Sequence, residues 1–147
     1  MFGNKQEENE ASWTAVTFRS EGGLYAFGIE TIAEILTASE VTPIPGLPPY
    51  IPGVINLRGE VIPVIDFRRR LGFEDAAPTG RETFMVIESE GTTAAIKTDM
   101  VVTSVTYTAK EYMTFGEDSV AAGIITNGGE RITLIDPKKL LEKKVNL

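Results

Sequence analysis

Two aspartates at equivalent positions of a repeated pattern are the residues whose type could serve acid–base chemistry. Asp66 and Asp136 each follow an apolar, β-branched run. Two carboxylates can exchange protons with a substrate when both face one pocket. Each also precedes a short helical pattern, Phe67 to Leu71 and Lys138 to Lys144, where its side chain would accept hydrogen bonds from free backbone amides. We therefore interpret both as helix N-caps and expect no catalytic pair.

The composition excludes most other types of catalytic site. The chain has no histidine and no cysteine, which excludes imidazole bases, Ser-His triads, phosphohistidine, His-ligated metals and thiolate chemistry. Asp99, Glu88 and Glu90 lack the spacing of a metal site, and we expect them on a solvated face. The sequence therefore predicts a protein that is not an enzyme, with no catalytic residue, no metal and no cofactor.

Arg58 is the residue that we single out for contact with a partner. It lies beside the apolar Leu57 in a predicted turn, where a long cation has no evident partner in its own chain. Its counterpart in the second copy of the pattern is Gly128, so the two copies differ here. The cluster Arg68 to Arg70 is a solvated helix face in our interpretation, with a docking contact as the alternative.

A β-hairpin is predicted to position Arg58. Two apolar runs flank Arg58 and Gly59, which is typical of such a hairpin: Val54 to Leu57 and Val61 to Ile65. Asn56 suits the first position of a type I turn and Gly59 the fourth, which gives a three-residue loop with Leu57 and Arg58 at its tip.

The same pattern occurs twice in the chain. Gly123 to Leu141 aligns with Gly53 to Leu71 without a gap, and the identical pairs are Gly53/Gly123, Ile55/Ile125, Gly59/Gly129, Glu60/Glu130, Ile62/Ile132, Ile65/Ile135, Asp66/Asp136 and Leu71/Leu141. Upstream, Ser20-Glu21-Gly22 corresponds to Ser89-Glu90-Gly91. An internal duplication of a small β unit follows, and two copies predict two lobes that share a core.

The predicted organisation is one all-β domain of two subdomains. We expect a disordered acidic tail over 1–11, a first β-barrel over 12–80, and a second β-barrel with a C-terminal helix over 81–147. Strands dominate the pattern, and short helices follow the two main hairpins. Between the first strands and the central hairpin, Glu30 to Leu36 predicts one helical turn followed by a strand.

The proline-rich segment Val41 to Pro52 is predicted to be an ordered, extended loop. Repeated prolines fix the backbone and remove hydrogen-bond donors. Two interpretations remain open: a rigid crossover packed on the barrel, or an exposed, preorganised contact surface.

The net charge of −7 bears on the possible partners. An acidic surface repels phosphate groups, which disfavours nucleic acid and anionic membranes. The chain contains no run long enough to span a bilayer, and its first ten residues are acidic where a signal peptide is basic and then apolar. We expect a cytoplasmic protein without membrane insertion.

At the central hairpin the chain resembles the chemotaxis coupling proteins of the CheW family. The likeness extends from about Trp13 to Leu141, and the residues that carry it are Tyr25-Ala26-Phe27-Gly28-Ile29, Glu34-Ile35, Gly53-Val54-Ile55-Asn56-Leu57-Arg58-Gly59 and Pro63-Val64-Ile65-Asp66-Phe67-Arg68. The resemblance implies two five-stranded, SH3-like β-barrels packed around a shared hydrophobic core. It also implies a non-enzymatic scaffold that couples chemoreceptors to the histidine kinase CheA.

The resemblance implies two docking surfaces. The receptor surface would use the groove between the lobes, with Ile32, Asn56, Leu57, Arg58, Phe84 and Val101. The surface for the regulatory domain of CheA would lie on the first barrel, near Glu34 and Ile35. Recruitment to membrane-associated receptor arrays would follow from these contacts.

Two alternatives stay open at this point. The first keeps the fold but places the chain in a non-flagellar chemosensory pathway, as in pilus or developmental signalling. The second is an unrelated small-barrel enzyme or oligonucleotide-binding domain, which the acidic charge and the absent histidine disfavour.

Overall fold

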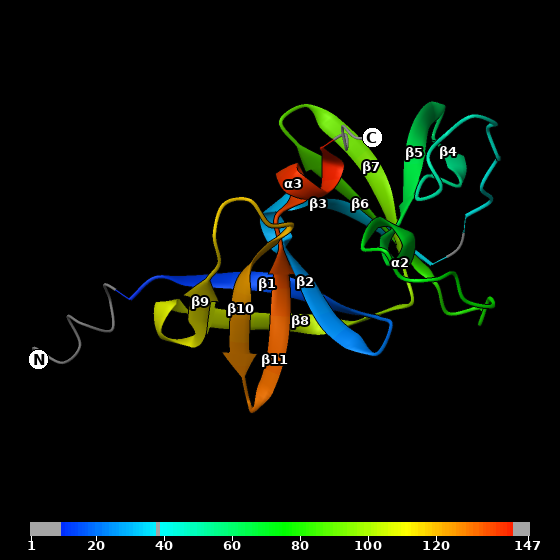
Figure 1. Ribbon diagram of the computed structural model, residues 1–147. Coiled ribbons are helices and arrows are strands. Elements are labelled where there is room, and N and C mark those ends of the chain that lie inside the picture. Colours follow the sequence, from blue (N-terminus) through cyan, green and yellow to red (C-terminus); the bar gives the residue numbers. More distant parts are fainter. Residues whose placement is uncertain (1–9, 38, 143–147) are drawn as a thin grey trace, which may run out of the picture.

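The computed structural model describes residues 10–37 and 39–142 and contains two β-sheets (Figure 1). The six-stranded sheet has the order β8 (Met100–Thr108), β1 (Ser12–Ser20), β2 (Gly23–Gly28), β11 (Glu130–Ile135), β10 (Ala121–Asn127) and β9 (Tyr112–Thr114). The five-stranded sheet has the order β3 (Ile32–Leu36), β6 (Thr83–Ser89), β7 (Thr92–Thr98), β5 (Glu60–Asp66) and β4 (Gly53–Leu57). The all-β prediction with two subdomains is confirmed. One sheet has six strands rather than five, because β9 forms in a polar stretch for which we predicted no strand.

Four short helices complete the described chain. They are the 3-10 turns η1 (Ile29–Thr31) and η2 (Ala109–Glu111) and the α-helices α2 (Phe67–Arg70) and α3 (Pro137–Leu141). The single turn η1 followed by β3 confirms the prediction for Glu30 to Leu36. Asp66 and Asp136 are N-caps as predicted: Asp66 Oδ1 accepts from the backbone amide of Arg68 at 3.1 Å, and Asp136 Oδ1 from that of Lys138 at 2.9 Å.

The central strands are buried on both faces, because each sheet curls around a core of its own and also packs against the other sheet. In β6, Phe84 and Val86 belong to the apolar cluster that the curled five-stranded sheet encloses, while Met85 and Ile87 belong to the shared core between the sheets. The shared core takes residues from both sheets and both α-helices: Val16, Phe18, Phe27, Ile65, Phe67, Met85, Ile87, Ala94, Ile96, Ile135 and Leu140. The hydrophobic core predicted between the subdomains is therefore present.

The turn between β4 and β5 differs from the prediction. Leu57 pairs with Glu60, so the loop has two residues, Arg58 and Gly59, with φ of 52° and 87°. These values are typical of a type I′ turn, whose twist matches that of the flanking strands. Asn56 Oδ1 accepts a hydrogen bond from the Gly59 amide at 2.8 Å. The three-residue loop was therefore wrong: Leu57 is a strand residue, and Arg58 shares the tip with Gly59.

The boundary at residue 80 does not separate the two sheets. The hairpin β1–β2 pairs with β8 and β11 from the second half of the chain, and β6–β7 pair with β3 and β5 from the first half. The assignment of 12–80 to one barrel and 81–147 to the other was therefore wrong, since the two repeats exchange their first hairpins. Both repeats have the same alternation of apolar residues, so pairing within a repeat and pairing between repeats satisfy the same pattern.

The proline-rich segment combines both predicted interpretations. Its end packs on the shared core through Tyr50 and Ile51, and the amide of Asp66 donates to the Tyr50 carbonyl at 2.8 Å. Its middle leaves Ile44 and Leu47 exposed. The segment is thus a packed crossover that also presents apolar side chains.

The predicted N-terminal tail and C-terminal helix are only partly covered by the described residues. Most of the predicted disordered tail, residues 1–9, lies outside the described residues, as does the end of the predicted C-terminal helix. Residues 10 and 11 are exposed and precede β1. No helix within the described residues is long and apolar enough to cross a bilayer.

Candidate functional site at the β4–β5 turn

Arg58 is paired with Glu34, contrary to the expectation that it has no partner in its own chain. Arg58 Nη2 lies 2.5 Å from Glu34 Oε1, and Nη1 donates to Oε2 at 3.2 Å. The pair is bidentate, the geometry in which a guanidinium binds a carboxylate most specifically. The structure therefore brings a predicted receptor residue into contact with a predicted kinase residue.

This pair joins the two edges of the five-stranded sheet. Glu34 belongs to β3 and Arg58 follows β4, and these strands lie at opposite ends of the strand order. Leu36 and Leu57, from the same two strands, pack against one apolar cluster inside the sheet. The sheet therefore curls until its edges meet, and the ion pair closes it on the outside.

The pair also sets the electrostatics of the site. The hydrogen bond from Arg58, aided by its positive charge, holds the pKa of Glu34 below its ordinary value of 4.5. In return, the Glu34 carboxylate raises the pKa of Arg58. Both groups therefore remain charged at neutral pH. The Arg58 side chain is 71% exposed, against 27% for Glu34, so the outer face of the guanidinium remains available to a partner.

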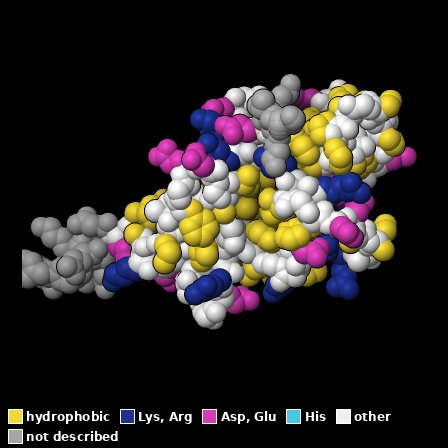
Figure 2. Space-filling view, in the orientation of Figure 1, with side chains coloured by type: hydrophobic (Ala, Val, Ile, Leu, Met, Phe, Trp, Pro, Cys, Tyr) yellow, Lys and Arg dark blue, Asp and Glu magenta, His cyan; other side chains and the backbone are white. Residues whose placement is uncertain are grey.

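Apolar and polar side chains surround the pair. Ile35 is exposed and Leu57 is half-buried. Asn56 pairs across the hairpin with Val61, whose side chain is 63% exposed. Sequence reasoning missed Val61, although its register opposite Asn56 was a usable signal. Figure 2 shows hydrophobic side chains gathered over β4, β5 and the proline-rich segment.

The other predicted receptor residues lie elsewhere. Ile32 and Val101 are partly buried and pack against the shared core, Ile32 from β3 and Val101 from β8. Phe84 is only 5% exposed and belongs to the interior of the five-stranded sheet. It therefore offers no surface to a partner, because its strand position directs its side chain inward. Ile32 and Val101 do not join the cluster around Arg58.

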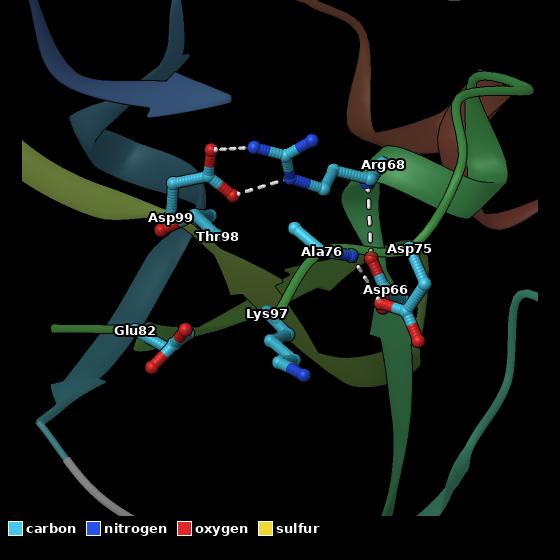
Figure 3. Close-up of a pocket in the computed structure, with 8 residues that line it drawn as sticks. All are labelled: Asp66, Arg68, Asp75, Ala76, Glu82, Lys97, Thr98 and Asp99. Carbon is cyan, nitrogen blue, oxygen red and sulfur yellow. Dashed lines mark hydrogen bonds and ion pairs between the residues drawn. The ribbon is translucent and has the colours of Figure 1, made fainter. Parts of the chain in front are cut away.

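A charged hollow beside α2 is the other concentration of ionisable groups (Figure 3). Arg68 binds Asp99 through two bonds, Nε to Oδ1 at 2.8 Å and Nη2 to Oδ2 at 2.6 Å, and also contacts Glu21. The hollow has a volume of about 20 Å³, which is room for a single water. It is too small for a substrate, and these ion pairs tie α2 to the β1–β2 turn and to the β7–β8 connection.

The same arginine cluster was predicted to be a solvated face, and only Arg69 fits that description. Arg70 is 6% exposed and donates from Nε to the Leu140 carbonyl and from Nη2 to the Lys139 carbonyl, both at 3.0 Å. Within the described part of the chain, no group of three or more acidic side chains could hold a metal ion. Arg68 and Arg70 are thus structural residues, which hold α2 against the β1–β2 turn, the β7–β8 connection and α3.

Comparison with known proteins assigns the chain to a family. The model of the CheW-like domain matches residues 14–145, which is nearly the whole chain. The protein belongs to the CheW-like family. The predicted resemblance and the prediction of a non-enzymatic scaffold are confirmed by this match and by the likeness to a solved scaffolding protein.

Individual CheW proteins are similar over most of their length. Chemotaxis protein CheW of Rhizobium meliloti is 31% identical over 127 residues, which cover 82% of each chain. A probable chemotaxis protein CheW of Rhizobium etli is 30% identical over 141 residues, 92% of this chain and 91% of the relative. The crystal structure of the scaffolding protein TtCheW from Thermoanaerobacter tengcongensis superposes with a TM-score of 0.85 at 25% identity, covering 92% of this chain and 97% of that one.

Proposed function

We propose that this protein couples chemoreceptors to the histidine kinase CheA in bacterial chemotaxis. The match of the CheW-like domain over residues 14–145 carries the proposal. A cytoplasmic scaffold of this kind, recruited to receptor arrays at the membrane, needs docking surfaces and no reaction centre. The β4–β5 turn and the edge strand β3 supply exposed groups of both polar and apolar character for such docking.

The receptor surface in this proposal is centred on the turn. Arg58 presents an exposed guanidinium, and Asn56 and Leu57 flank it. Ile32 and Val101 extend the surface along the border of the shared core. Phe84 acts from inside, since it packs in the same apolar cluster as Leu57, and thereby supports the turn without touching a receptor.

The kinase surface in this proposal is β3, around Glu34 and Ile35. This strand lies at an edge of the five-stranded sheet, pairs with β6 and presents the exposed side chain of Ile35. Because Glu34 holds Arg58, a receptor carboxylate that binds Arg58 would release Glu34 on the neighbouring surface. The ion pair thus offers a direct physical connection between the two docking events.

Two weak contacts would suffice for stable assembly. Once the kinase is bound, engagement of the receptor is effectively intramolecular, and short connections give effective concentrations of about a millimolar. The scaffold can therefore hold receptor and kinase together even when its affinity for each of them is modest.

The test separates a direct contact of Arg58 from its role in the ion pair. In co-sedimentation with receptor-containing membranes, we expect Arg58→Glu to weaken receptor binding by roughly tenfold or more, because a repulsive charge replaces an attractive one. Binding to the CheA regulatory domain should survive. The matched control is Arg131→Glu, the same charge change at an exposed position on β11, and it should leave both affinities unchanged.

A charge-swap variant completes this experiment. Glu34→Arg combined with Arg58→Glu restores an ion pair but leaves the receptor facing a carboxylate. If Arg58 contacts the receptor, the swap remains defective. Recovery of receptor binding by the swap, or unchanged binding by Arg58→Glu alone, would contradict the proposed contact.

A further inference from the structure

A second hollow lies on the six-stranded sheet, away from the β4–β5 turn. It is bounded by the start of β1, the turn η1 and the junction of β11 with α3, and its volume is about 180 Å³. Trp13, Tyr107, Glu30 and Asp136 contribute its aromatic and charged side chains. Nothing in the proposed coupling function uses these four residues.

Two aromatic rings form one wall of the hollow. The ring centroids of Trp13 and Tyr107 are 5.8 Å apart with an interplanar angle of 33°. Trp13 is 46% exposed although it is the largest apolar side chain of the protein, so residues 10–37 and 39–142 leave much of its indole uncovered. Large aromatic residues left open beside a hollow commonly mark a contact site.

Tyr107 adds a polar group with no partner in the described residues. Its side chain is only 7% exposed, and no hydrogen bond to its hydroxyl occurs among residues 10–37 and 39–142. Burial raises the pKa of Tyr107, and Tyr112 and Glu30 raise it further. The phenol therefore stays neutral, and its hydroxyl can donate or accept a hydrogen bond.

The charge of the lining is entirely negative. Glu30 and Asp136 are the ionisable acids of the hollow, and its lining includes no lysine or arginine. The Glu30 carboxylate lies over Gly28 and makes no ion pair with any residue that the structure describes. Asp136 uses Oδ1 for the Lys138 amide, which leaves its second oxygen for another donor.

We propose that this hollow binds an arginine side chain of a protein partner. A guanidinium is planar and can stack on the open face of Trp13, where the ring attracts a cation. Its fork of N–H donors can satisfy the two carboxylates and the Tyr107 hydroxyl together. An ammonium group has no such plane, so lysine fits the same lining less well. The site lies on the six-stranded sheet, whereas Arg58 and Glu34 close the five-stranded one, so both can be occupied at once.

The only tryptophan of the chain is Trp13, so its fluorescence reports this hollow directly. The full chain is titrated with the blocked peptide acetyl-Gly-Arg-Gly-amide and with matched peptides that carry lysine or the uncharged citrulline. We expect a saturable change with the arginine peptide, roughly fivefold weaker binding of the lysine peptide, and no saturation with citrulline. Backbone amide NMR spectra should show shifts around Trp13, Glu30 and Asp136.

Matched variants test the charge of the site. Glu30→Gln should weaken the arginine peptide by roughly fivefold, because a neutral amide replaces an exposed carboxylate partner. Glu60→Gln, the same change beside the β4–β5 turn, should bind as the unmodified chain does. Absence of saturation with the arginine peptide, equal binding of the citrulline peptide, or no effect of Glu30→Gln would each overturn the proposal. None of these readouts depends on receptor or kinase, so this site and the coupling function can fail separately.

Discussion

Arg58 has a backbone conformation that glycine adopts more easily. Its φ is 52°, and the corresponding residue of the second repeat is Gly128 with φ of 57°. Glu21 and Glu90 share this strained conformation, so strain alone does not distinguish a docking residue. What distinguishes Arg58 is its side chain, which forms a bidentate ion pair with Glu34 on the outside of the sheet. This partner is distant in sequence and could not be recognised from the turn alone.

The buried cap Asp66 gives a prediction about pH. Asp66 is 6% exposed, and burial raises the pKa of its carboxyl above 3.8, opposed in part by Lys97. A raised folded-state pKa means that Asp66 favours folding most below pH 3.8, and that this contribution is lost as pH rises through the folded-state pKa. We expect Asp66→Asn, which keeps the cap, to gain stability relative to the unmodified protein as pH rises from 3 to 7.

Urea unfolding at several pH values measures this difference. Asp66→Ala is the companion variant: it removes the cap and should cost about 1 kcal/mol at neutral pH. A difference between Asp66→Asn and the unmodified protein that stays constant with pH, or shrinks as pH rises, would contradict the assigned role of burial.

At the scale of elements, Gly53 and Gly123 occupy equivalent positions in the β4–β5 and β10–β11 hairpins, and both are in steric contact with a neighbouring segment. A Cβ at Gly53 would collide with the backbone carbonyl of Thr42, and one at Gly123 with the carbonyl of Met113. Thr42 bridges to Val54 and β9 pairs with β10, so each hairpin has a third segment pressed against its first strand. The identity of Gly53 and Gly123 in the repeat thus has a steric cause.

Gly53→Ala should therefore be strongly destabilising. The added methyl group meets backbone rather than a flexible side chain, and we expect a loss of about 2 kcal/mol in the free energy of unfolding. Gly116→Ala is the matched control, since a Cβ there meets nothing within 4 Å, and its effect should stay within about 0.5 kcal/mol. Chemical denaturation measures the free energy of unfolding of both variants. Equal stabilities of Gly53→Ala and Gly116→Ala would refute the steric explanation.

The helices also connect the repeats. Arg70 of α2 binds the last carbonyls of α3 and lies 5.5 Å from the ring centroid of Tyr50. Its aligned counterpart is Leu140, whose own carbonyl it contacts. One helix thus supplies a buried cation and the other the acceptors. Sequence reasoning placed Arg70 in solvent because three successive arginines on a short helix gave no sign that one of them was covered.

At the scale of the whole molecule, the exchange of hairpins makes the two sheets inseparable. Each sheet needs strands from both sides of residue 80. The shared core joins residues of both sheets, and the rings of Phe18 in β1 and Phe67 in α2 have their centroids 4.9 Å apart. We expect the fragments 12–80 and 81–147 to be unfolded alone and to form the native structure when mixed. Dispersed amide NMR spectra would appear only in the mixture.

A control for this experiment is cleavage of the intact chain in the exposed connector before β6. The cut protein should remain associated and folded, because no strand is interrupted. A dispersed spectrum from the fragment 12–80 alone would show that the first half folds independently, in conflict with the observed strand pairing.

Local features were predictable because they depend on neighbouring residues. The alternation of apolar positions predicted most strands, the aspartates predicted the capped helices after both hairpins, and Glu30 to Leu36 was correctly divided into a turn and a strand. The strand β9 was missed, because three residues in a polar stretch carry too short a pattern. The turn at Arg58 was misjudged by one residue, since Asn56 and Gly59 suit both loop lengths.

Amino-acid order alone established a duplicated, β-rich chain with one unusual cation at a hairpin tip, since periodicity, caps and composition are local properties. Tertiary packing alone determined which copy of the hairpin completes which sheet, that Arg58 meets Glu34, and that Phe84 and Arg70 are buried. Two repeats with the same alternation of apolar residues offer two pairings that satisfy the same local pattern. Only the fit of side chains in a core common to both sheets selects between them.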